Sequence, residues 1–130
     1  MITTRHVMLW LRSMFPTIDW ATGAIDKGKD EAVGVYARRH GLLQPKPMNG
    51  PAGYGVKAIS LLIRWGTSAT PCEEKAIEIY NRLQECSTQE TIGGRKCWVD
   101  ARQAPVLIGK GDRDIFECVL DFDVYFRKEG

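Results

Sequence analysis

A strict alternation of apolar and polar side chains near residue 120 limits most strongly what this chain can fold into. A period of two places alternate side chains on one face of a β-strand. Burying each large apolar side chain contributes roughly 1.5–3 kcal/mol. We therefore predict a long strand over 114–127 that supplies a main part of the core. Its apolar positions are Phe116, Cys118, Leu120, Phe122, Val124 and Phe126.

A first amphipathic helix is predicted over about 3–15. Apolar side chains recur there at three- and four-residue spacing, which is typical of a helix with one buried face. Thr3 or Thr4 can cap its first turn. Pro16 ends it, because a proline pushes the preceding residue away from helical angles.

A second helix is predicted over about 71–86. Thr70 is expected to be the cap, Pro71 to take the first helical position, and Glu73 to complete a capping box. Its apolar stripe includes Cys72 and Cys86. The glutamates on the other faces of this helix are interpreted as solvated surface rather than as an acid–base pair.

The remaining apolar runs are short and read as strands. "EAVGVYARR", "KCWVDA" and "APVLIG" are expected strands, and "TIGGRK" carries a Gly-Gly turn. "YGVKAISLLIRWG" is apolar on both faces, which suits a central strand covered on both sides. We predict one α+β domain, 1–130, with a mixed, mostly antiparallel sheet packed against two helices.

A Pro/Gly-rich loop is predicted at about 40–54, where three prolines and several glycines exclude a regular helix. Long loops of this kind are often functional. The apolar side chains in and beside it are candidates for contact with a partner or with another copy of the chain. They are Leu42, Leu43, Met48 and Tyr54.

Three carboxylates, Glu117, Asp121 and Asp123, fall on the polar face of the predicted 114–127 strand. Two carboxylates two residues apart can bind a cation or share a proton. We interpret the three instead as an acidic face that limits edge-to-edge sheet contacts or faces the channel of an oligomer. We expect no metal site, because no further ligands cluster in the sequence.

Charge and cysteine usage narrow the class of protein. A net charge of +2, from 18 basic and 16 acidic residues, offers no concentrated basic surface, so we expect no specific nucleic-acid binding. Four cysteines without CxxC spacing predict reduced thiols in a reducing compartment. No apolar run is long enough to suggest a membrane span or a leader. Neither histidine stands in a recognisable catalytic motif.

The order of segments 70–128 resembles a family of bacteriophage minor capsid proteins of the tail-terminator and tail-completion group. The helix "TPCEEKAIEIYNRL" is followed by "KCWVDARQAPVLIGKGDRDIFECVLDFDVYFRK", with a short strand, a proline, an apolar strand, a polar turn and an alternating strand. "TRHVMLWLRSMFP" is similar to the family's N-terminal helix. The 40–54 segment matches no part of the family pattern.

The resemblance implies a virion structural protein at the head–tail joint, assembled in the bacterial host cytoplasm. It implies a homo-oligomer, a hexameric ring in tail terminators, in contact with tail-tube and head-connector proteins. DNA would pass through the assembly without specific binding. The resemblance implies no reaction, no cofactor and no catalytic residues. The alternative is a small cytoplasmic α+β enzyme or ligand-binding domain, which should have a concave site with convergent polar groups.

Overall fold

In the computed structural model the described residues are 2–25, 28–38, 54–86 and 89–127. Leu42, Leu43 and Met48, and most of the predicted 40–54 loop, lie outside these ranges. Tyr54 begins a strand, but its side chain is not among those described. None of the helices in the described ranges has the length and apolarity needed to cross a membrane.

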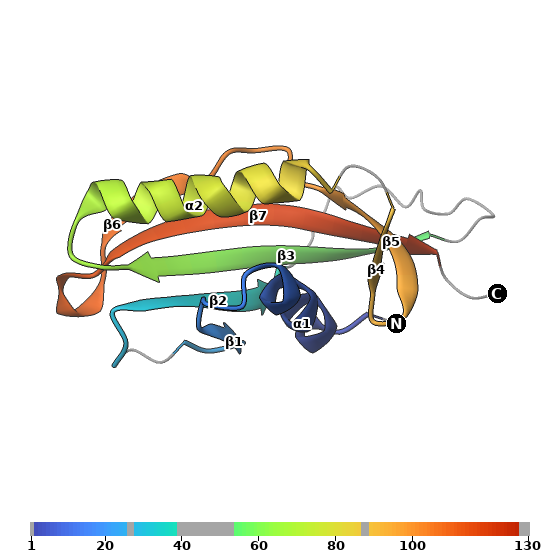
Figure 1. Ribbon diagram of the computed structural model, residues 1–130, viewed down its shortest axis with the longest axis horizontal. Helices are drawn as coiled ribbons and strands as arrows, with labels where there is room; N and C mark the ends of the chain where they lie inside the picture. Colours follow the sequence, from blue (N-terminus) through green and yellow to red (C-terminus); the bar gives the residue numbers. More distant parts are fainter. Residues whose placement is uncertain (1, 26–27, 39–53, 87–88, 128–130) are drawn as a thin grey trace.

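The described ranges form two helices and seven strands (Figure 1). A short 3-10 turn, η2, precedes the last strand. In order, the elements are α1 Thr4–Met14, β1 Trp20–Thr22, β2 Glu31–Ala37, β3 Tyr54–Trp65, α2 Ala69–Gln84, β4 Glu90–Ile92, β5 Arg95–Asp100, β6 Val106–Lys110, η2 Asp112–Asp114 and β7 Phe116–Arg127.

All seven strands belong to one sheet with the order β1-β2-β3-β7-β5-β4. The β1–β2 pair is parallel and every other pair is antiparallel. Strand β7 pairs with β3 along one edge. Along its other edge it pairs first with β6 and then with β5. The predicted α+β fold, with a mostly antiparallel sheet and a long strand near residue 120, is confirmed.

The helix α1 begins as predicted. Thr3 is the N-cap: its hydroxyl accepts from the backbone N–H of His6, and the His6 ring accepts from the backbone N–H of Thr3. This reciprocal pair satisfies two of the N–H groups that a helix start leaves open. Val7 and Leu11, on the inner face of this helix, are fully buried.

The start of α2 differs from the prediction. The N-cap is Ser68 and the helix begins at Ala69, so Thr70 lies inside the first turn rather than capping it. Ser68 makes no side-chain cap hydrogen bond, and the expected capping box with Glu73 is absent. Pro71 fits this earlier start, because the N–H groups of the whole first turn have no intrahelical partner and a proline lacks that group.

The apolar set of β7 lies in the core, as predicted, and α2 packs against this strand. Cys118, Leu120, Phe122 and Val124 are each at most 1% exposed, and they share one core cluster with buried side chains of α1 and α2. In Figure 1, α2 runs along β7 while α1 lies beside β1 and β2. Both helices therefore cover the same face of the sheet.

The predicted cover on both sides of β3 is wrong. Ile59, Leu61 and Ile63 are fully buried in the core cluster, whereas Leu62, on the other face, is only half-buried and lies outside that cluster. An antiparallel sheet can leave one face to solvent. The apolar residues on this second face thus mark a surface rather than a second core.

Strand β1 was not predicted, because residues 17–31 look like a polar connection in the sequence. Trp20, Ala21 and Thr22 pair with Val33–Val35 of β2 in parallel register. The Trp20 indole N–H donates to the Phe15 carbonyl oxygen at 3.0 Å. Pairing with β2 and packing of Trp20 against α1 hold this strand, and both contacts depend on the tertiary fold.

Candidate functional site

The face of the sheet that the helices leave uncovered carries most of the polar side chains of the central strands. We call it the open face. The strand registers place these residues on it: Gly34, Tyr36, Val56, Ala58, Ser60, Leu62, Arg64, Trp98, Asp100, Val106, Glu117, Val119, Asp121, Asp123 and Tyr125.

An apolar row crosses the open face at mid-sheet. Val106 of β6 pairs with Val119 of β7, Val119 with Leu62 of β3, and Leu62 with Gly34 of β2. Val106 is 62% exposed. Ile108, at the β-bulge of β6, is 57% exposed. Both of these exposed side chains belong to β6, and the half-buried Val119 and Leu62 lie beside them on the next two strands. An apolar patch of this kind is typical of a contact surface.

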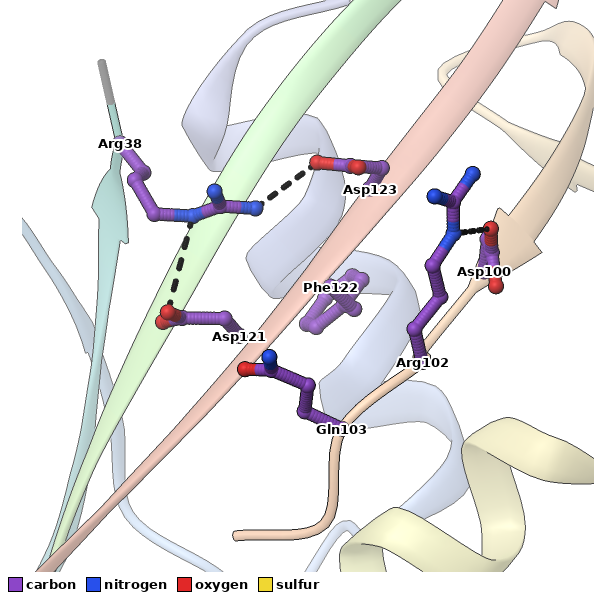
Figure 2. Close-up of a pocket in the computed structure, with 7 residues that line it drawn as sticks. All are labelled: Arg38, Asp100, Arg102, Gln103, Asp121, Phe122 and Asp123. Carbon is purple, nitrogen blue, oxygen red and sulfur yellow. Dashed lines mark hydrogen bonds and ion pairs between the residues drawn. The ribbon is translucent and has the colours of Figure 1, made fainter. Parts of the chain in front are cut away.

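A charged cluster lies beside this row, towards β5. Arg38 follows β2 and reaches across β3 to two carboxylates of β7 (Figure 2). Its Nη2 donates to Asp123 Oδ1 at 2.8 Å, and its Nε lies 3.8 Å from Asp121 Oδ2. The Asp121 contact is too long for a hydrogen bond. Asp121 Oδ1 and Arg38 Nε have no hydrogen-bond partner in the described ranges.

A cavity of about 200 Å³ opens next to Arg38. It lies where β5 has ended and β6 has not yet begun, so β7 has no paired strand on this edge at Phe122, whose other edge pairs with Ile59 of β3. Figure 2 shows Gln103 and Arg102 on the side opposite Arg38. Arg102 Nε donates to Asp100 Oδ2 at 2.6 Å, and this hydrogen bond raises the pKa of Arg102. The lining therefore holds two guanidinium groups and three carboxylates.

A second ion pair lies on the other side of the apolar row. Arg64 is only 1% exposed; its Nη1 lies 3.5 Å from Glu117 Oε2, and its Nη2 donates to the Asp112 carbonyl oxygen at 3.2 Å. The turn after β6 covers it. A Cβ at Gly111 would lie 2.6 Å from the Glu117 carboxyl group, so a side chain there would require that carboxyl group to shift.

The predicted acidic face is only partly exposed. Glu117, Asp121 and Asp123 do share one face of β7, but each lies beside an arginine and their side chains are 19%, 38% and 23% exposed. Arg38 and Arg64 were missed as site residues. The "ARR" and "IRW" strings gave no sign of them, because arginine 38 and aspartate 123 are 85 residues apart in sequence.

The cysteines are all buried and reduced in the described ranges. The Sγ atoms of Cys72 and Cys118 lie 3.5 Å apart between α2 and β7. Burial is the main cause that raises the pKa of Cys72, to about 12, and the hydrogen bond with Cys118 adds to it. These thiols belong to the core. In the described part of the chain, no three His, Cys, Asp or Glu side chains are grouped to hold a metal ion.

Comparisons with known proteins give no family. No protein-family model matches the chain, and no curated protein matches it. One solved structure aligns over 97% of this chain and 90% of its own length, with 11% identity and a TM-score of 0.48. Its name states no function. At this level the similarity supports no conclusion about fold or function.

Proposed function

We propose that this chain is a structural protein of a bacteriophage virion that acts at the head–tail joint by docking to other subunits. The proposal combines the resemblance of residues 70–128 to minor capsid and tail-terminator proteins with one structural observation. That observation is the open face, where Val106 and Ile108 are more than half exposed beside half-buried Leu62 and Val119.

The chemistry of the open face suits a protein contact. It presents aliphatic and aromatic side chains next to arginines, a composition enriched in protein interfaces. The role needs no reaction and no cofactor. Its partners would be tail-tube and head-connector proteins and further copies of the chain, assembled in the host cytoplasm.

Electron microscopy of the purified chain, alone and mixed with tail tubes of its phage, tests the proposal. We expect rings in the free protein, six-fold if it is a tail terminator, or density capping the tube ends. A chain that forms no ring and leaves every tube end bare would contradict the proposal. Tubes incubated with an unrelated protein of similar size are the control.

A ligand-binding domain is the second candidate, and the cavity beside Arg38 favours it. Opposed charges around about 200 Å³ are the kind of convergent polar lining that small-molecule sites use. A thermal-shift screen of small zwitterions and dicarboxylates separates the two. A ligand that raises Tm in the native chain but not in an Arg38→Gln variant would favour binding over docking.

A further inference from the structure

Between Glu117 and Asp123 of β7, the charges of the open face are divided between its two halves. On one side of the β3–β7 boundary lie two arginines, Arg38 after β2 and Arg64 on β3. On the other side lie the carboxylates Glu117, Asp121 and Asp123 of β7 and Asp100 of β5. Two cations on this second side, Lys96 and Arg127, lie beyond the row through Asp123. Arg102, which follows β5 and pairs with Asp100, lies beyond these strands.

This division makes the face complementary to itself. Consider two copies related by a two-fold axis that runs parallel to β3 and β7, above the boundary between them. Each half of one copy then faces the other half of the second copy. Across the strands at the level of Asp123, four residues lie side by side in the order Arg38, Ala58, Asp123 and Asp100. The rotation places Arg38 of one copy opposite Asp100 of the other, twice per pair. Their side chains are 33% and 37% exposed, so both can be reached.

The apolar row is complementary under the same rotation. Val119 and Leu62 exchange places, so these half-buried side chains of the two copies meet at the axis. Val106, the most exposed apolar side chain of the row, meets the position of Gly34. Gly34 carries no side chain, and the Tyr36 ring lies over it, since a Cβ there would be 2.8 Å from that ring. The exposed Val106 side chain of one copy would therefore pack on the Tyr36 ring of the other.

We infer that the open face binds a second copy of this chain, face to face, through a two-fold contact that pairs Arg38 with Asp100 and covers Val106. A two-fold contact uses the same patch on both partners and closes at a dimer. The contact therefore goes beyond the ring of the proposed function, which needs a head-to-tail contact. Two sheets pack in this way at about 10 Å separation.

Complementary charge reversals test the contact. In a dimer of Arg38→Glu, the new glutamate of each copy faces Asp100 of the other copy. In a dimer of Asp100→Arg, the new arginine of each copy faces Arg38 of the other copy. Each should raise the dimer dissociation constant at least about tenfold, as like charges across an interface do. An equimolar mixture of the two variants restores both opposite-charge contacts. Sedimentation equilibrium should show this mixture returning to twice the 14.6 kDa chain mass.

Circular dichroism shows whether Arg38→Glu folds. If it does not, a second pair of variants still tests the contact. Val106→Glu changes an exposed side chain and should also abolish the dimer. Ile77→Glu is its control: Ile77 is 47% exposed on α2, away from the open face, and the variant should dimerise as the native chain does.

Three results would overturn the inference: a native chain that stays monomeric at every concentration, a Val106→Glu variant that dimerises normally, or folded charge variants whose mixture stays monomeric. Hexamers that Val106→Glu leaves intact would also overturn it while supporting the ring. Dimers that never cap tail tubes would support this contact and count against the head–tail role.

Discussion

Arg64 is the residue whose environment differs most from that of an ordinary surface arginine. Its charged side chain is only 1% exposed, forms an ion pair with Glu117 and donates a hydrogen bond to a carbonyl oxygen of the η2 turn. Removing one partner of a buried ion pair leaves the other charge without compensation, which costs more than the pair contributes. Arg64 therefore ties the turn before β7 to the open face of β3.

Glu117→Gln should reveal this dependence. Because it leaves Arg64 buried without a counter-charge, we expect the free energy of unfolding to fall by about 3 kcal/mol, measured by urea denaturation. Glu78→Gln is the matched control: Glu78 is 54% exposed in its pair with Lys75, and its loss should cost under about 1 kcal/mol. Equal losses in the two variants would argue against a special role for Arg64.

Cys72 gives the fold a pH dependence at the alkaline end. Its thiol has a pKa of about 12 in the folded chain, against 9.0 for the free group, mainly through burial. The unfolded chain loses this proton first, so the stabilisation is complete below pH 9 and is lost as pH rises towards 12.

We expect the free energy of unfolding to decline above pH 9 in the native chain and to decline less steeply in Cys72→Ala, once each is referred to its own value at pH 7. Urea titrations at several pH values measure both slopes. Identical slopes in the two proteins would show that Cys72 does not titrate as its burial requires.

At the scale of helices and strands, the periodicity of apolar residues predicted the elements whose formation depends on local sequence. The β7 alternation, the α1 stripe and the Gly-Gly turn between β4 and β5 are all present. Strand β1 and the face of β3 that no helix covers could not be predicted, because each depends on which elements pack there. Leu62 looks like a core residue in the sequence, but both helices cover the opposite face.

The site was predictable only in part for the same reason. A period of two puts Glu117, Asp121 and Asp123 on one face of a strand, and the structure has them there. Their arginine partners are Arg38, directly after β2, and Arg64 of β3, which lie 85 and 53 residues away in sequence. No local pattern reports such contacts, since they follow from strand order.

The two helix starts offer a direct comparison. Thr3 caps α1 through a hydrogen bond to His6, whereas Thr70 lies inside the first turn of α2 without capping it. Thr3→Ala should therefore lower the free energy of unfolding by about 1 kcal/mol. Thr70→Ala should change it by less than about 0.5 kcal/mol. Thermal unfolding of both variants measures this, and a larger loss for Thr70→Ala would restore the predicted start of α2.

At the scale of the whole molecule, one face of the sheet is used for stability and the other is available for contact. The helices bury the apolar set of β7 and β3 on one side. The other side keeps an apolar row between two sets of arginine–carboxylate pairs. Under the proposed function, the buried side of the sheet is the rigid core and the open face is the interaction surface.

Hydrogen exchange of the purified chain across a concentration series tests this division most directly. If the open face is an assembly surface, the amide groups of β6 around Val106 should gain protection as concentration rises, while core amides of β7 around Leu120 stay protected throughout. Protection around Val106 that does not change with concentration, in a chain that also leaves tail tubes bare, would contradict the central claim.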